Sequence, residues 1–128
     1  GEDAPGEMPR YELGELPEGF VENLESQFVG TGMTAHFYEN EKGDVILFEY
    51  IYMQQGSSSG ASTENAYVVS VSINRCEGLL VIPKEENSNS MLMWFDPEHN
   101  LQFTLDAPLG QEDILHMAES VHLVETMK

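Results

Sequence analysis

Four histidines and one cysteine are the side chains of this sequence best suited to bind a metal ion or to act in catalysis. No two histidines have the H-x-H or H-x-x-x-H spacing that brings two imidazoles to one metal ion. On an expected C-terminal helix, His116 and His122 are six residues apart and point about 120° away from each other. His36 falls in an expected strand and His99 in an expected turn. The pattern therefore predicts no metal site and no cofactor.

Cys76 is the only thiol, which excludes an intramolecular disulfide and any multi-cysteine metal site. Arg75 is its lone positive neighbour and Glu77 opposes that charge, so nothing local favours an activated thiolate. We interpret Cys76 as a small apolar residue at the end of a strand. A partner histidine could still meet it in space, because such pairs need not be adjacent in sequence.

Side chains with carboxylate or amide oxygens gather in two expected turns, at Asn40, Glu41 and Asp44 and at Asp96, Glu98 and Asn100. Neither turn has the ligand spacing of a helix-loop-helix calcium site, and calcium needs six to eight oxygen ligands. We interpret both as solvated turns, with weak calcium binding as the alternative. Chance pairs of carboxylates are inevitable among 23 acidic residues, so no catalytic pair is assigned.

Large aromatic residues are the candidate ligand or partner surface. Phe48, Tyr50 and Tyr52 alternate along one expected strand and therefore share one sheet face, and Trp94 belongs to another strand. Packing in the core is the simpler interpretation, because a domain of this size must fill its interior. A groove for a lipid or a peptide on a curved sheet is the alternative.

The charge balance limits the partners. The 128 residues hold 23 acidic and five basic side chains, for a formal net charge of -18. Such a field repels phosphate groups, so we expect no nucleic acid and no direct binding to an anionic membrane. The hydrophobic fraction of 41% and the aromatic content are high enough for a folded core.

The elements that must position these residues are mostly strands. Alternating or dense β-branched and aromatic residues predict them, and a Gly-containing turn joins the first two into a hairpin. The expected strands cover residues 33–39, 44–53, 67–74, 78–83, 91–95 and 101–105. The last two form a second hairpin around the turn at 96–100. Residues 20–29 weakly favour a strand, and the Gly- and Ser-rich residues 54–66 are expected to form a loop.

The C-terminal region changes period. Ile114, Met117, Ala118 and Val121 form one apolar stripe of an amphipathic helix, with Gly110 as its N-cap. Strands followed by one helix predict an α+β fold, a curved antiparallel sheet of hairpins with the C-terminal helix packed on one face. We expect residues 1–9 to be a flexible tether and residues 10–128 to form one α+β domain.

Three segments carry a family resemblance: LPEGF at 16–20, FYENEKGDVILF at 37–48, and the residues from MWF at 93 through FTL to EDILHMAESV ending at 121. In this order they resemble an uncharacterised extracytoplasmic domain family of Gram-positive bacteria, over about residues 10–124. The resemblance implies lipoproteins or the outer domains of single-span membrane proteins, some similar to anti-sigma factors. It also implies structural roles for Pro17, Gly19, Tyr38, Asn40, Gly43, Trp94 and Ala118.

These observations together predict a non-enzymatic extracytoplasmic binding or sensory domain, with any membrane anchor preceding residue 1. Its partner would be a protein or a peptide, contacted through residues 54–66 or an exposed strand edge. The alternative is a carrier or sensor of a hydrophobic small molecule or lipid in the concavity of the sheet. An enzyme would instead need convergent His, Cys or carboxylate groups.

Overall fold

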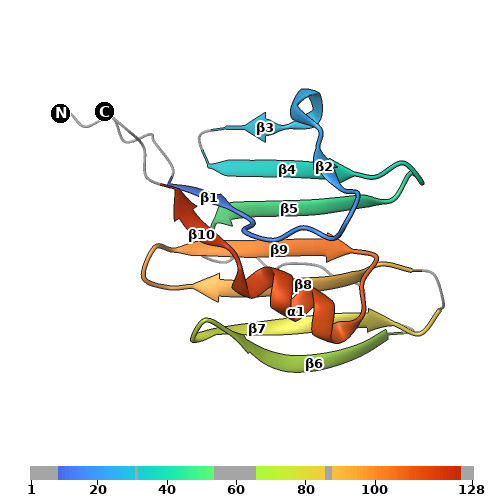
Figure 1. Ribbon diagram of the computed structural model, residues 1–128. Coiled ribbons are helices and arrows are strands. Elements are labelled where there is room, and N and C mark those ends of the chain that lie inside the picture. Colours follow the sequence, from blue (N-terminus) through green and yellow to red (C-terminus); the bar gives the residue numbers. More distant parts are fainter. Residues whose placement is uncertain (1–8, 31, 54–65, 86–87, 125–128) are drawn as a thin grey trace.

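The computed structural model describes residues 9–30, 32–53, 66–85 and 88–124, and strands dominate them (Figure 1). The larger sheet is antiparallel and open, and its strands follow the order β2-β4-β5-β9-β8-β7-β6, with β3 also paired to β4. In chain order they are β2 (Val21–Glu22), β3 (Phe28–Val29), β4 (Met33–Glu39), β5 (Val45–Tyr52), β6 (Ala66–Ile73), β7 (Cys76–Pro83), β8 (Ser90–Asp96) and β9 (Leu101–Ala107).

The turns use the residues that their backbone angles require. Between β6 and β7, Asn74 and Arg75 have φ angles of 49° and 75°, which matches the two-residue turns that suit a twisted hairpin. Between β4 and β5, Gly43 has φ 89°, and the Asn40 side chain accepts hydrogen bonds from the backbone N–H groups of Lys42 and Asp44. The structure thus gives Asn40 and Gly43 the structural roles that the family resemblance implies.

The core lies on one face of this sheet, where aromatic rings of neighbouring strands stack side by side. The ring of Trp94 stacks on Phe103 with centroids 5.1 Å apart, and Phe103 lies 5.7 Å from Tyr50 and 6.2 Å from Phe48. Such cross-strand neighbours are the contacts that stabilise a sheet. Fully buried aliphatic residues complete the core face: Ile46, Ile73, Leu80, Leu92, Leu101 and Leu105.

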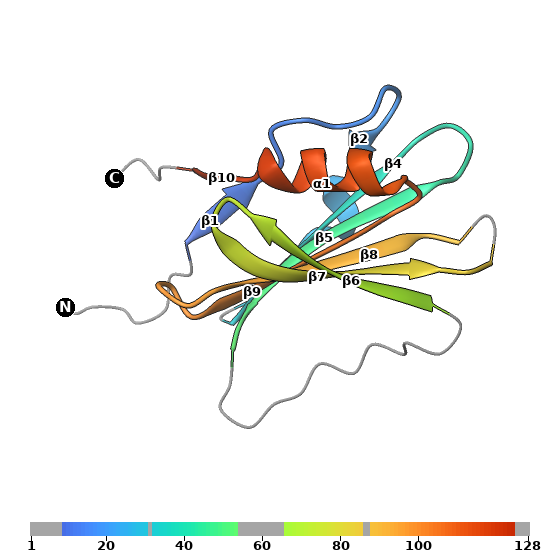
Figure 2. The same ribbon diagram turned by 90° about the horizontal axis from the view of Figure 1, so that it is seen from below.

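The α-helix α1 (Gln111–Glu119) covers part of the core face (Figure 2). It buries Ile114, Met117 and Ala118 and lies against β6, β8 and β9. The acidic residues Glu112 and Asp113 stand in its first turn, where the positive end of the helix dipole stabilises negative charge. The helix therefore presents an apolar stripe to the sheet and charged residues to the solvent.

A two-stranded sheet continues this second layer beyond the helix. β1 (Arg10–Glu12) pairs antiparallel with β10 (His122–Val124), which follows α1 directly. Tyr11 packs edge-on against the rings of Tyr50 and Phe103, with centroids 5.4 and 5.0 Å away. Its backbone N–H also donates a hydrogen bond of 3.0 Å to the Tyr50 hydroxyl. The N-terminal strand is thereby fixed over the part of the core that α1 does not reach.

The predicted α+β class, the two hairpins and the C-terminal helix on one face are confirmed. Residues 20–29 are divided into β2, a short 3-10 helix η1 (Leu24–Ser26) and β3, because Asn23 caps η1 through hydrogen bonds from the N–H groups of Glu25 and Ser26. The helix ends two residues before Val121, and His122 lies in β10 instead of on the helix. Residues 54–65 of the expected loop at 54–66 and residues 1–8 of the expected tether at 1–9 lie outside the described residues, and Ala66 is the first residue of β6 instead of the last of a loop.

A substitution at Gly78 would test how tightly neighbouring strands of the sheet are packed. It pairs with Trp94, and a Cβ at this position would lie 2.6 Å from the Met93 carbonyl oxygen and 3.0 Å from the Trp94 Cβ. Because backbone cannot move aside cheaply, Gly78→Ala should lower the free energy of unfolding by about 1–3 kcal/mol. Gly32→Ala is the matched control: its nearest atom is 3.9 Å away, so the change should stay within about 0.5 kcal/mol. Equal urea midpoints for the two variants would contradict this packing.

Candidate binding groove beside the helix

The candidate aromatic surface lies mostly inside the molecule. Phe48, Tyr50 and Trp94 are 0%, 1% and 3% exposed, and they belong to the stacked core face. They therefore have no surface to offer a partner in this fold, and their burial matches the core-packing interpretation. Tyr52, at the end of the same strand, is half-buried and packs against the edge of the core. Phe48, Tyr50 and Tyr52 share a sheet face, as the alternation predicts, and the strand register adds Trp94 to it. This is the face that the second layer covers.

A groove forms where the segment after β1 runs along α1, and Ser120 fixes the separation of the two. The Ser120 hydroxyl oxygen accepts hydrogen bonds of 3.1 Å from the backbone N–H groups of Gly14 and Glu15, and it donates to the Met117 carbonyl oxygen at 2.6 Å. The Gly14 N–H also lies 3.0 Å from the Ser120 carbonyl oxygen. A Cβ at Gly14 would lie 2.8 Å from that same oxygen, so only glycine permits this approach.

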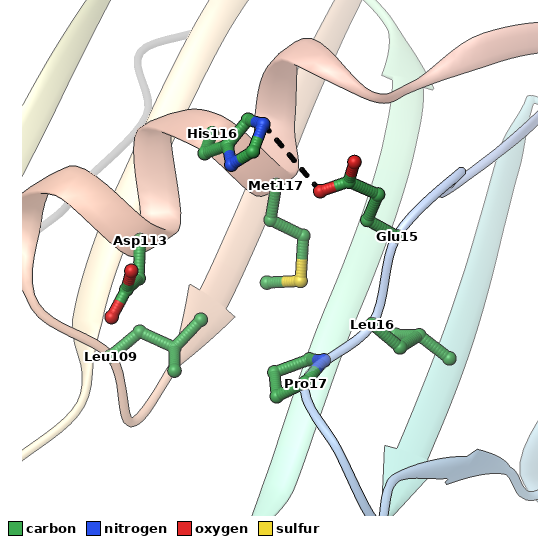
Figure 3. A pocket seen from close by; sticks show the side chains of 7 residues that line it. All are labelled: Glu15, Leu16, Pro17, Leu109, Asp113, His116 and Met117. Carbon is green, nitrogen blue, oxygen red and sulfur yellow. Dashed lines mark ion pairs between the residues drawn. The ribbon is translucent and has the colours of Figure 1, made fainter.

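The groove has an apolar floor and an acidic rim (Figure 3). Its volume is about 270 Å³, and it opens to solvent. The thioether of Met117 lies between the two walls, one built by α1 with Leu109 and the other by the strap of residues 15–17. The lining residues are Glu15, Leu16, Pro17, Leu109, Asp113, His116 and Met117.

Charge at the rim is unevenly distributed. Glu15 and His116 face each other across one end of the groove, with 3.6 Å between a carboxylate oxygen and Nε2, and both side chains are largely exposed. Asp113 stands one helical turn earlier on the same wall, beside Leu109. Because exposed ion pairs contribute little binding energy, the His116–Glu15 contact is easily exchanged for a cation brought by a ligand. The groove can therefore accept an aliphatic chain that ends in a positive charge.

The remaining histidines contact different groups. His36 is buried on β4, where its Nδ1 lies 2.7 Å from a Glu22 carboxylate oxygen and its ring stacks on Phe48. His122 lies beside the Ser120 carbonyl oxygen at 3.2 Å. His99 lies 2.8 Å from Asp96 in the turn between β8 and β9, and this hydrogen bond raises the pKa of His99. In that turn, candidate ligand atoms of Asp96, Glu98 and His99 all fall within 4.8 Å of one another.

Cys76 lies at the start of β7 and is half-buried. Burial raises the pKa of its thiol, and the negative charges of Asp96 and Glu98 raise it further. A raised pKa lowers the thiolate fraction at neutral pH, and the thiolate is the nucleophilic form. The environment of Cys76 thus opposes nucleophilic activation, in agreement with its interpretation as a small apolar residue.

Sequence reasoning did not predict the groove, although two of its lining residues belong to a segment that the sequence analysis singled out. Leu16 and Pro17 belong to the LPEGF segment of the family resemblance, and Leu109 precedes the helix as an isolated apolar residue. Their meeting depends on contacts between residues more than a hundred positions apart. Gly19, in the same segment, has φ 91°, a conformation that glycine adopts without strain.

Comparisons with known proteins identify a family and leave its activity open. A family model described as "Domain of unknown function (DUF4367)" matches residues 10–121. No curated protein and no solved structure matches the chain. Among the described residues, no helix has the length and apolar character needed to cross a membrane.

The raised pKa of Cys76 predicts slow alkylation. At about pH 8.5, the ordinary pKa of a thiol, iodoacetamide should modify the folded protein more slowly than the urea-unfolded chain, and the folded rate should keep rising at higher pH. Glu98→Gln should speed the folded reaction by removing one negative charge. Glu41→Gln, an exposed change in the turn between β4 and β5, is the control and should leave the rate unchanged. A folded rate equal to the unfolded rate would contradict the pKa shift.

Proposed function

The chain belongs to the DUF4367 family, and we propose that it is a non-enzymatic extracytoplasmic binding domain that recognises a basic segment of a protein partner. The groove between α1 and residues 15–17 receives one lysine or arginine side chain of that segment. In the full-length protein the domain is tethered to the membrane and serves a sensory or regulatory role. The acidic rim over an apolar floor is the observation that carries this proposal.

The volume of the groove suits a side chain better than a free ligand. Sites for small molecules usually measure about 300–1,000 Å³ and enclose most of the ligand, whereas this groove measures about 270 Å³ and is open. A lysine side chain combines an apolar stem with a charged end, and it commonly lies along apolar surface with the charge in water. Its stem would contact Met117 and Leu109, and its ammonium group would reach Asp113 or Glu15.

The charge of the whole domain favours the same partner. A net charge of -18 attracts basic segments over long distances and speeds their association, most strongly at low salt. It repels a second copy of the chain and other acidic proteins. Long-range attraction and the local rim therefore select for the same sign of charge.

The alternative function, a carrier of a hydrophobic molecule in the concavity of the sheet, has less support. The residues that would line such a cavity, among them Phe48, Tyr50 and Phe103, are buried against one another and against Tyr11. A ligand would have to separate these stacked rings. The groove lies instead on the outer side of the core, between the helix and the strap.

The proposed extracytoplasmic location is supported by the three motif segments and their family resemblance. We expect external protease added to intact producing cells to digest the full-length protein while cytosolic enzymes survive. After lysis, the protease should digest the cytosolic enzymes as well as the full-length protein, which controls for intrinsic resistance to the protease. Protection in intact cells together with cleavage after lysis would contradict this part of the proposal and leave the groove assignment untouched.

The groove assignment is tested with peptide probes. A labelled peptide of alternating Lys and Leu should bind and shift the methyl signal of Met117 in the ¹³C-methionine NMR spectrum, whereas a Glu and Leu peptide should not. The double variant Glu15→Lys and Asp113→Lys should weaken binding of the basic peptide by at least about tenfold, or ~1.4 kcal/mol. Affinity is measured by fluorescence anisotropy at matched ionic strength.

The control carries the same change in net charge elsewhere. Glu25→Lys with Glu41→Lys reverses two exposed carboxylates outside the groove and should lower the affinity only slightly. Equal weakening in both double variants would show that the peptide follows net charge alone and would contradict a specific site. An unchanged Met117 signal on binding would place the peptide elsewhere and contradict the assignment.

A further inference from the structure

The turn between β8 and β9 gathers donor groups that the proposed function does not use. Asp96 ends β8, and Glu98 and His99 follow within the turn. One ligand atom from each of these side chains lies within 4.8 Å of the others. Their mixture of oxygen and imidazole nitrogen distinguishes this group from the carboxylates that are spread over the rest of an acidic surface.

The turn holds the side chains of Asp96 and His99 in place before any ion arrives. Asp96 pairs with the fully buried Leu101 in the last register position of the β8–β9 ladder, so its backbone is anchored in the sheet. One Asp96 carboxylate oxygen accepts hydrogen bonds from the backbone N–H groups of Glu98 and His99, at 3.1 and 3.4 Å. The other lies 2.8 Å from Nδ1 of His99. A ligand set that is already assembled loses less conformational entropy on binding an ion.

We propose that Asp96, Glu98 and His99 form a site for a divalent transition-metal ion such as Zn²⁺, Ni²⁺ or Cu²⁺. Each carboxylate supplies one oxygen and the imidazole supplies one nitrogen, and water completes the coordination. Zn²⁺ is bound by imidazole nitrogen and carboxylate oxygen in four-coordinate sites. Affinity for nitrogen and oxygen donors rises towards Cu²⁺ along the first-row series. Calcium and magnesium instead favour oxygen-only sites with six or more ligands, which one hairpin turn does not supply.

The site would be separate from the groove in both ligands and position. It lies at the turn between two strands of the larger sheet, whereas the groove is built by α1 and the strap of residues 15–17. Both Glu98 and His99 are exposed, so an ion reaches them without any movement of the core. A bound ion would tie Asp96, at the end of β8, to the turn that leads into β9, and should stabilise this hairpin.

The experiment titrates the metal-free protein with ZnCl₂, NiCl₂ and CuCl₂ by isothermal calorimetry, with CaCl₂ and MgCl₂ as comparison ions. We expect one saturable site for the transition metals and no comparable site for calcium or magnesium. His99→Ala and Glu98→Gln should each weaken metal binding by at least about 10–100-fold. Loss of an outer-shell partner of a ligand already costs that much affinity, and these changes remove a ligand itself. Both side chains are exposed, and circular dichroism verifies that each variant is folded.

Two further variants make the assignment specific. His122→Ala removes another exposed histidine and should leave the affinity unchanged. Continuing the β7–β8 register beyond Gly78 and Trp94 puts Cys76 beside Asp96, so Cys76→Ser tests binding through the thiol. Binding that is lost in Cys76→Ser and kept in His99→Ala would overturn the proposal. Equal binding of calcium and zinc, or the absence of a saturable site, would overturn it as well.

Discussion

The width of the sheet is the constraint on which the rest of this structure depends. The seven strands that lie side by side from β2 to β6, about 4.8 Å apart, make the sheet about 29 Å wide. The nine residues of α1 make a helix only about 13.5 Å long. One such helix cannot cover the stacked rings of β5, β8 and β9. The N-terminal strand supplies the missing cover, because Tyr11 closes over Tyr50 and Phe103 while β1 pairs with β10.

This division of the second layer between two ends of the chain also creates the groove. The connection from β1 to β2 passes the end of α1, and its residues 15–17 form one wall of the groove beside the helix. Ser120 joins the two at one point, through hydrogen bonds to Gly14 and Glu15. The groove therefore lies between the helix and the N-terminal connection, which the fold needs independently to cover the core. Its rim is acidic, as is the surface around it.

Charged side chains lie where water can hydrate them. The stacked core face contains aliphatic and aromatic residues, and the acids gather in turns, at the helix start and along the strap. Glu49 shows the cost of departing from this pattern, because burial between strands raises the pKa of its carboxyl. His36, His99 and His116 each lie beside a carboxylate. Such a surface can form new contacts with basic segments and with metal cations.

The sequence by itself determined the local elements, since alternation, turn residues and helical period act between near neighbours. The hairpins around Gly43 and Asn100 and the stripe of Ile114 and Met117 needed no tertiary information. Division of residues 20–29 depended on a side-chain cap that propensity does not encode. Only the tertiary structure decided that β1 would pair with β10 and that a strap would lie beside α1. These contacts join residues over a hundred positions apart, and sequence spacing carries no distance between side chains that meet only after folding.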